Sequence, residues 1–283
     1  DIINDLEKQY GKGAVSYGQE PKNNYIVVST GSLSLDIATG IGGIPVGEEG
    51  KIIEMYGWES SGKSSISQNI IANYQKKNLK KCILVDGENS LDAKYAEALG
   101  VDLKNLYIIQ LDESAGEGAF NKVEQLVSSG EVGLVIYDSY NALQPKKVVE
   151  GVVGESNLGL HARMLGQAVM KCNSLCGKYG CTFIYLGQLR ERIGILYGDT
   201  STTQGGNALK FYSHMRMKVS RSTTKDNSVM DGEDKLGNLT KVEIVKNKLA
   251  PPFKKAEFNI LYGIGIDKIA EIIELASTNE IIR

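Results

Sequence analysis

The sequence has no excess of positive charge: 32 lysines and arginines stand against 34 aspartates and glutamates, a formal net charge of −2 over 283 residues. This balance excludes a protein that is basic over its whole surface, and it excludes a long acidic tail. A polyanionic partner would therefore have to meet a local basic patch. With 42% apolar and 23% charged residues, the composition is that of a globular protein with one large domain or two smaller ones.

Cysteine, histidine and long apolar runs are also scarce. Four cysteines are too few for a disulfide scaffold, and the spacing of Cys172, Cys176 and Cys181 does not match a zinc motif. Because only two histidines accompany them, we expect buried, reduced thiols in a cytoplasmic protein. No apolar run reaches the length of about 18 residues that a membrane span needs, so no membrane partner is expected. The first residues lack both an initiator Met and a signal-peptide pattern, which indicates that residues are missing upstream.

The chain divides into three parts by its hydrophobic pattern. Residues 2–10 form an amphipathic helix, and with the polar stretch that follows they make an N-terminal arm over 1–24. From residue 25, short apolar runs alternate with helical stretches, which predicts an α/β core with a mostly parallel sheet over 25–265. The expected strands are 51–57, 81–87, 106–110, 133–139 and 181–187, and the expected helices are 63–77, 92–99, 115–129 and 158–178.

The pattern changes after the last of these strands. Residues 189–207 are polar and rich in Gly and Thr, too long for a tight connection, so they form either a functional or a disordered surface loop. Residues 214–221, 240–248 and 256–263 then alternate apolar and polar side chains, as antiparallel strands at one sheet edge do. A final helix begins near Lys268, in a C-terminal region over 266–283.

A phosphate-binding motif follows the first core strand and opens a helix. It matches the pattern G-x-x-x-x-G-K-[ST], in which glycines let backbone N–H groups point at phosphate oxygens and the helix N-terminus adds partial positive charge. Lys63 would reach the terminal phosphates of ATP, and the Ser64 hydroxyl would hold Mg²⁺. The predicted nucleotide-binding residues are Gly57, Trp58, Glu59, Ser60, Ser61, Gly62, Lys63, Ser64 and Ser65.

Carboxylates at the ends of two other strands complete the expected site. Asp138 ends an apolar strand and is the predicted second magnesium ligand, with a helix cap as its alternative role. Glu88 lies just past another strand end, where its side chain can reach a water molecule beside the terminal phosphate. Asp86, inside that strand, is expected to be structural.

With these parts placed, the chain resembles the RecA recombinases of bacteria, ATP-driven proteins that exchange DNA strands. The resemblance covers nearly the whole chain and rests on segments such as STGSLSLDIATG, YGWESSGKSS, GGNALKFY and VKNKLAPPFK, which follow the family's order. It implies a RecA-type P-loop ATPase core with antiparallel strands at one edge, preceded by a helix–strand arm for polymerisation. It also implies ATP and Mg²⁺ as cofactors.

The resemblance assigns roles to residues around the nucleotide. Glu88 matches the glutamate that activates the hydrolytic water, and Asp138 matches the magnesium-binding aspartate. Asp92 and Tyr95 match residues that flank the adenine. Gln188 matches the glutamine that senses the γ-phosphate and passes its state to a DNA-binding loop.

The resemblance also implies contacts between subunits. Lys246 and Lys248 match lysines that reach the ATP of a neighbouring subunit, although on the residues alone a solvated strand face is the simpler interpretation. Lys210 and Phe211 match interface residues that communicate the nucleotide state along a filament. The strand near Ala14 belongs to the expected polymerisation arm.

A local basic patch is now found where DNA would bind. Residues 188–221 hold six basic and two acidic side chains, a charge of +4, and include the long polar loop. The resemblance implies DNA-binding loops near 146–159 and 189–206, where backbone amides, hydroxyls and arginines hold phosphates without reading sequence. The predicted DNA-binding residues are Arg163, Arg190, Arg192, Thr202, Thr203, Gly205, Gly206 and Asn207.

Several positions depart from the family pattern. Trp58 stands inside the P-loop where Pro is usual, and Gly187 precedes Gln188 where Asn is usual. Met170 falls where the family tends to carry a basic residue. The chain also ends before the family's small C-terminal domain is complete.

The function expected from this sequence is a DNA-dependent ATPase of recombination and DNA repair. It would polymerise head to tail on single-stranded DNA and exchange strands with homologous double-stranded DNA, because a heterologous interface that does not close into a ring generates a helical filament. A ring-forming helicase of the same fold is one alternative. A nucleotide-switched scaffold without useful turnover is another, and Glu88 argues against it.

Overall fold

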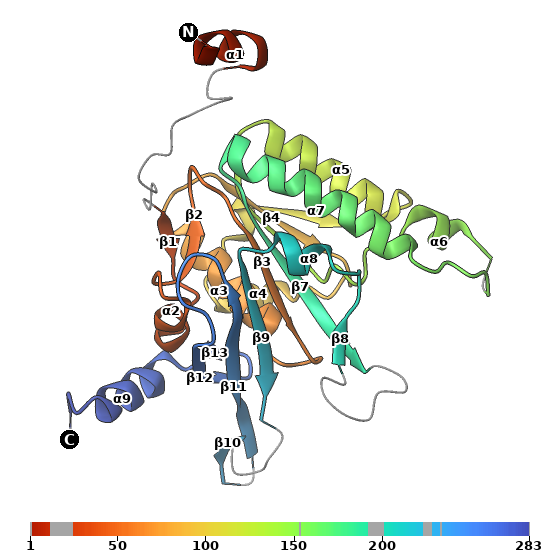
Figure 1. The fold of residues 1–283 in the computed structure, drawn as a ribbon. Helices are drawn as coiled ribbons and strands as arrows, with labels where there is room; N and C mark the ends of the chain where they lie inside the picture. Colours follow the sequence, from red (N-terminus) through yellow and green to blue (C-terminus); the bar gives the residue numbers. More distant parts are fainter. Residues whose placement is uncertain are drawn as a thin grey trace.

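The computed structural model describes residues 2–11, 25–152, 154–191, 201–222, 228–232 and 234–282. Helix α1 (Ile2–Tyr10) forms where the amphipathic pattern predicts it, and its residues are exposed or half-buried. The expected strand near Ala14 lies outside the described residues. From residue 25 the chain folds into an α/β structure (Figure 1).

A long mixed sheet forms the centre of the fold. Its strand order is β13-β12-β11-β9-β3-β7-β6-β4-β5, with β10 added to β11 and β8 added to β7. Six neighbouring strands, β9, β3, β7, β6, β4 and β5, run parallel to one another. Strand β11 pairs antiparallel with β9, and β12 and β13 continue the sheet in antiparallel pairs. The strands of the sheet are β3 (Ile52–Gly57), β4 (Lys81–Asp86), β5 (Leu106–Gln110), β6 (Val132–Asp138), β7 (Thr182–Glu191), β8 (Ser201–Thr203), β9 (Met215–Arg221), β10 (Ser228–Asp231), β11 (Asp234–Asn247), β12 (Lys255–Leu261) and β13 (Gly265–Ile266).

Burial along the strands explains the two sequence patterns. Every residue of β6 from Val132 to Tyr137 is buried, as expected for a parallel strand covered on both faces. Strand β12 instead alternates exposed and buried residues, as an antiparallel strand with one covered face does. A separate antiparallel pair, β1 (Ile26–Val28) and β2 (Ile44–Val46), precedes the sheet.

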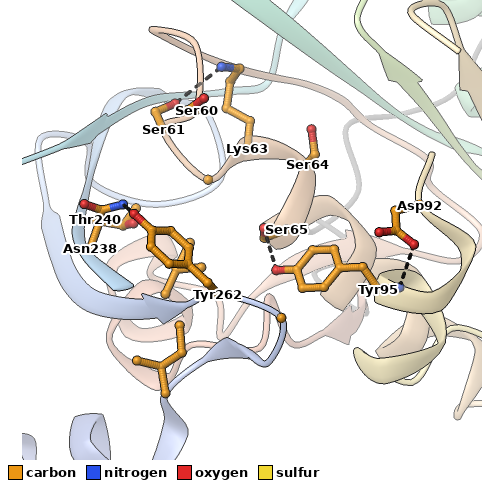
Figure 2. A pocket seen from close by; sticks show the side chains of 14 residues that line it. Ser60, Ser61, Lys63, Ser64, Ser65, Asp92, Tyr95, Asn238, Thr240 and Tyr262 are labelled. Atoms are coloured by element: carbon orange, nitrogen blue, oxygen red, sulfur yellow. Dashed lines mark hydrogen bonds between the residues drawn. The ribbon is translucent and has the colours of Figure 1, made fainter. Parts of the chain in front are cut away.

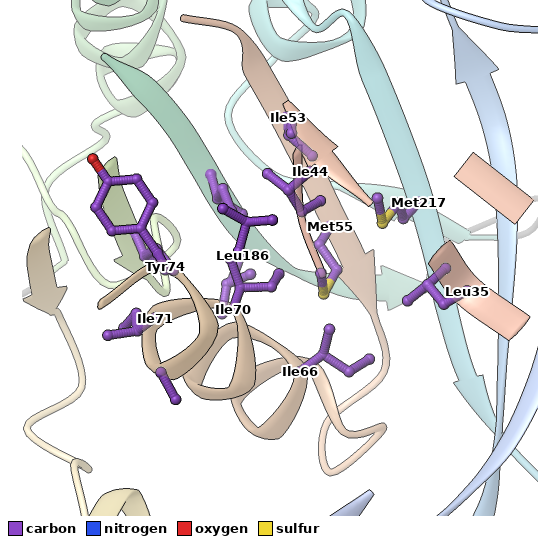
Figure 3. Packing of buried hydrophobic residues seen from close by; sticks show 14 of the residues in the cluster. Leu35, Ile44, Ile53, Met55, Ile66, Ile70, Ile71, Tyr74, Leu186 and Met217 are labelled. Carbon is purple, nitrogen blue, oxygen red and sulfur yellow. The ribbon is translucent and has the colours of Figure 1, made fainter. Parts of the chain in front are cut away.

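Helices cover both faces of the central strands and create two apolar clusters. Figure 3 shows Ile66 and Ile70 of α3 packing toward Met55 and Leu186 of the sheet. Helices α5 and α7 cover the opposite face. The helices after α1 are α2 (Leu33–Thr39), α3 (Lys63–Gln75), α4 (Ala93–Ala98), α5 (Ala115–Ser128), α6 (Lys146–Glu150), α7 (Leu160–Tyr179), α8 (Ala208–Tyr212) and α9 (Lys268–Thr278), and a 3₁₀ turn spans Leu103–Asn105.

The expectation of a loop over 189–207 was wrong for residues 189–191 and 201–203, which belong to strands. Strand β7 continues to Glu191 and pairs antiparallel with β8, with Arg190 opposite Thr202. The run of threonines suits a strand, and the ladder supplies backbone partners that the polar composition did not reveal. Residues 192–200, including Arg192, lie outside the described residues.

The last helix is tied to the core through one carboxylate. Glu271 of α9 is buried, and it accepts hydrogen bonds from the backbone N–H groups of Leu33 (3.0 Å) and Ser34 (2.9 Å) at the start of α2. A negative charge is favourable there because the helix N-terminus is partially positive. In the part of the chain that the structure describes, no helix is both long and apolar enough to cross a membrane.

Candidate nucleotide site and nucleic-acid surface

The P-loop lies between the end of β3 and the start of α3, at the carboxyl edge of the parallel strands. Two of its glycines leave no space for a side chain, and one of them also has a backbone conformation that favours glycine. A Cβ on Gly57 would lie 1.9 Å from the Val219 carbonyl oxygen. Gly62 has φ +96°, and a Cβ there would lie 2.5 Å from Ile260. The loop therefore passes too close to β9 and β12 for a side chain at either position.

Lys63 is buried and folded back onto the loop that precedes it. Its Nζ donates to the carbonyl oxygens of Trp58 (2.7 Å) and Gly57 (3.2 Å) and to the Ser61 hydroxyl (3.3 Å). Burial lowers the pKa of Lys63, and the charges of three nearby carboxylates, Asp138 first, oppose this change. Phosphate oxygens can replace neutral carbonyl partners with a stronger, charge-assisted interaction.

The two predicted magnesium ligands are neighbours. The Ser64 hydroxyl, at the start of α3, lies beside the Asp138 carboxylate at the end of β6, and both residues line one small hollow. Burial raises the pKa of Asp138 to about 6; the charges of Glu88 and Asp86 act in the same direction, while Ser64 and Lys63 oppose them. A hydroxyl and a carboxylate side by side form an oxygen-only donor pair.

Glu88 and Gln188 are brought together from two different strand ends. Glu88 Oε1 accepts a hydrogen bond from Nε2 of Gln188 at 2.7 Å and another from the Ser139 hydroxyl at 2.6 Å. Asp86, by contrast, accepts from two backbone amides of the following turn at 3.0 and 3.1 Å, which confirms its structural role. The residue predicted to activate water thus contacts the residue predicted to sense the phosphate.

A cavity of about 410 Å³ opens beside the P-loop (Figure 2). Residues 60–65 line one side, and Asp92 and Tyr95 line another. Asp92 caps α4 by accepting from the Tyr95 backbone N–H at 3.1 Å, and the Tyr95 hydroxyl donates to Ser65 Oγ at 2.9 Å. Trp58 instead lies beside a different hollow, with Lys218 and Lys255.

Six residues that the sequence did not single out also line this cavity: Asn238, Thr240, Ile260, Leu261, Tyr262 and Gly263. Asn238 Nδ2 donates to the Tyr262 hydroxyl at 2.6 Å. Asn238 Oδ1 is buried, and it has no hydrogen-bond partner among the residues that the structure describes. Tyr95 and Tyr262 approach the cavity from opposite sides (Figure 2). These residues lie far from the P-loop in sequence and carry no motif, so only the folded sheet edge brings them to it.

The predicted subunit-contact residues form one surface. Lys246 Nζ donates to the carbonyl oxygens of Lys210 (2.6 Å) and Phe211 (3.0 Å) at the end of α8. Burial lowers the pKa of Lys246, and the charge of Lys248 adds to this effect. Phe211 is 71% exposed. Lys246 and Lys248 are not among the described residues that line the cavity beside the P-loop.

The predicted DNA-binding residues separate into exposed and buried groups. Arg163 on α7 and Arg190 on β7 are exposed, as are Gly206 and Asn207, which precede α8, whereas Gly205 is buried and Thr202 half-buried. The Thr203 side chain is buried and lies near the Tyr140 hydroxyl, and its contact with DNA stays a prediction. Arg190 donates from Nε and Nη1 to the Gln204 amide oxygen, both at 3.1 Å.

Comparison with known proteins gives consistent matches over this chain. The family model described as the RecA N-terminal domain matches residues 1–267. Protein RecA of Clostridium novyi is 46% identical over 282 residues, which are 99% of this chain and 78% of that protein. Protein RecA of Porphyromonas gingivalis is 45% identical over 98% of this chain and 79% of its own length. Protein RecA of Cytophaga hutchinsonii is 47% identical, with shares of 96% and 75%.

Proposed function

This chain belongs to the RecA family of ATP-dependent recombinases. We propose that the cavity beside its P-loop holds ATP, and that ATP binding there lets the chain assemble on DNA. The chain is a DNA-dependent ATPase of recombination and repair. The observation that carries the residue-level proposal is the hydrogen bond between Glu88 and Gln188, since it joins the hydrolytic site to the strand that leads into the β7–β8 hairpin.

The P-loop binds the phosphates of ATP. Its inward N–H groups and the N-terminus of α3 favour negative charge, and Lys63 exchanges its carbonyl partners for phosphate oxygens. Tyr95 and Tyr262 hold the base between them, with Asp92 beside Tyr95. This arrangement is supported by the size and lining of the cavity.

Ser64 and Asp138 hold Mg²⁺ together with the phosphates. Their oxygens suit this hard cation, which keeps water and phosphate ligands and does not need a protein cage. Among the described residues, no group of three or more His, Cys, Asp or Glu side chains could hold a metal ion by itself. When bound, Mg²⁺ neutralises charge that develops on the phosphates.

Glu88 orients the attacking water and accepts its proton. Its exposed carboxylate lies past the end of β4 and already accepts two hydrogen bonds, so its position is fixed before substrate arrives. When the γ-phosphate is bound, Gln188 changes its hydrogen bond to Glu88. Because Gln188 belongs to β7, the change reaches the hairpin that faces DNA.

The filament completes the active site between subunits. Lys246 and Lys248 neutralise charge on the ATP of a neighbouring subunit, and Lys210 and Phe211 form part of the same interface. The filament forms on single-stranded DNA and pairs it with homologous double-stranded DNA, held by Arg163, Arg190, Gly206 and Asn207. The N-terminal arm docks on the adjacent subunit. These assignments follow the family's geometry and the exposure of the side chains.

The test is steady-state ATP hydrolysis with and without single-stranded DNA. We expect the rate to rise about tenfold or more on adding DNA, and we expect Gln188→Ala to lose most of this rise. Gln125→Ala, an exposed glutamine on α5, is the matched control and keeps the parent response. A parent rate that does not respond to DNA would contradict the proposal.

A further inference from the structure

Tyr140 is a fully buried tyrosine two residues beyond Asp138, and no sequence pattern assigns it a role. Its hydroxyl meets two polar partners. It donates to Glu54 Oε1 at 3.3 Å, and it lies near the side chain of Thr203, the last residue of β8. Glu54 in turn is fully buried and forms an ion pair with Arg216 of β9. The hydroxyl therefore lies between the middle of the sheet and strand β8.

The ring of Tyr140 fills the space that a side chain at position 187 would need. A Cβ on Gly187 would lie 2.6 Å from Tyr140 Oη and 2.7 Å from Cε1. Gly187 does not have a positive φ, so the need for glycine here is steric and not conformational. On the other side, a Cβ on Gly205 would lie 3.5 Å from Cε2 of the same ring. Tyr140 is thus packed between β7 and the end of β8.

Backbone and side-chain contacts also fix β7 on both sides of Gly187. The backbone N–H of Tyr140 donates to the Leu186 carbonyl at 3.1 Å. The next residue, Asn141, accepts the backbone N–H of Gln188 at 2.7 Å with its Oδ1. Residues 140–141 therefore hold the segment of β7 that contains the proposed phosphate sensor.

We propose that Tyr140 is a positioning residue that couples the Gln188 segment of β7 to strand β8 and to the Glu54–Arg216 pair, an inference that rests on the proposed function of Gln188. A ring packed on all sides passes on a displacement of its neighbours because a close-packed interior has no free volume to absorb it. The hydroxyl also links the ring to Glu54, because a hydrogen bond to a charged group is stronger than one between neutral groups. In this chain the tyrosine ring takes the place of a side chain at 187.

The test compares Tyr140→Phe with Tyr137→Phe in the full chain. Both changes remove one hydroxyl from a fully buried ring, but the Tyr137 hydroxyl faces Cys172 Sγ at 3.9 Å and no charged group. We expect Tyr140→Phe to lower the DNA-stimulated rate of ATP hydrolysis about five- to tenfold, the effect of losing one ordinary hydrogen bond. We expect its DNA-independent rate to equal the parent rate, because Tyr140 is not among the described residues that line the nucleotide cavity.

A second measurement separates coupling from simple destabilisation. Hydrogen exchange reports on the β7–β8 ladder, in which Leu189 lies opposite Thr203. We expect faster exchange in this ladder for Tyr140→Phe than for Tyr137→Phe, at equal thermal stability. If Tyr140→Phe matches Tyr137→Phe in DNA stimulation and in exchange while the parent is stimulated by DNA, the inference is overturned alone. A parent without DNA stimulation overturns the proposed function, and the inference with it.

Discussion

Replacing Glu88 by Gln tests the hydrolytic site most sharply, because the change keeps the size of the side chain and removes only its charge and its basicity. Oε1 of Glu88 accepts from Gln188 at 2.7 Å and from Ser139 at 2.6 Å. An amide oxygen can still accept these bonds, so the local geometry is retained. The variant therefore isolates the proton-accepting role.

The expected loss follows from the role of a general base. Such groups contribute about 10²- to 10⁴-fold, so we expect kcat to fall about a thousandfold, a rise in the barrier of about 4 kcal/mol. ATP binding should not weaken. The Glu88 charge acts on both Lys63 and Asp138, and its removal takes one negative charge away from the phosphate site.

The assay is single-turnover hydrolysis of radiolabelled ATP in the presence of single-stranded DNA, with binding of a fluorescent ATP analogue measured in parallel. Glu97→Gln, an exposed glutamate on α4 outside the cavity, is the control and should match the parent. A Glu88→Gln chain that hydrolyses ATP within about threefold of the parent rate would refute the assignment of Glu88 as the base.

Three further changes test the surrounding structure. Arg216→Ala leaves the Glu54 carboxylate buried without its ion-pair partner, and we expect urea unfolding to show a loss of about 3–5 kcal/mol. Gly187→Ala places a Cβ against the Tyr140 ring and should cost about 1–3 kcal/mol in the same assay, with recovery when Tyr140→Val is added. Burial lowers the pKa of His214 to about 4. Acid should therefore destabilise the parent more than it destabilises His214→Asn. At pH 5 we expect a difference of about 1 kcal/mol in the free energy of unfolding, after allowance for the partial exposure of His214.

The sign of the pH effect is set by the neutral form of His214. In the folded chain its Nδ1 accepts the Ile52 backbone N–H at 3.2 Å, and this bond needs the unprotonated nitrogen. The unfolded chain takes up a proton below the ordinary pKa of 6.5, whereas the folded chain does not until about pH 4. Stability is therefore complete above pH 6.5 and is lost as pH falls toward 4. Equal acid sensitivity of parent and His214→Asn would contradict this account.

The other two predictions can also be contradicted. If Arg216→Ala lowers the free energy of unfolding by less than about 1 kcal/mol, Arg216 does not compensate the buried charge of Glu54. If Tyr140→Val does not recover the stability lost in Gly187→Ala, the two side chains do not compete for the same space.

Local patterns in the sequence predicted the parts of the fold that depend on neighbouring residues. The P-loop is contiguous, so its glycines, Lys63 and the helix that follows could be recognised from spacing alone. The buried runs of β4 and β6 likewise predicted strand ends that deliver Glu88 and Asp138. Each inference needed only one element and the rule that parallel strands share a carboxyl edge.

Contacts between distant segments could not be predicted in this way. Asn238 and Tyr262 enter the nucleotide cavity from strands whose alternating pattern indicates burial but not neighbours. The resemblance assigned Thr203 to a DNA-binding loop, and it could not show that pairing with β7 places this side chain in the interior near Tyr140. A register shift of one residue would reverse this orientation, and register is decided by the folded sheet.

The central claim is that this chain, with ATP, pairs single-stranded DNA with a homologous duplex. The most direct measurement is the formation of joint molecules between a labelled single strand and supercoiled DNA, with the chain as the only protein present. The account predicts joint molecules with ATP and homologous DNA, and none with heterologous DNA, without nucleotide, or with Lys63→Ala. Joint molecules that form equally on heterologous DNA, or that the parent never forms, would contradict it.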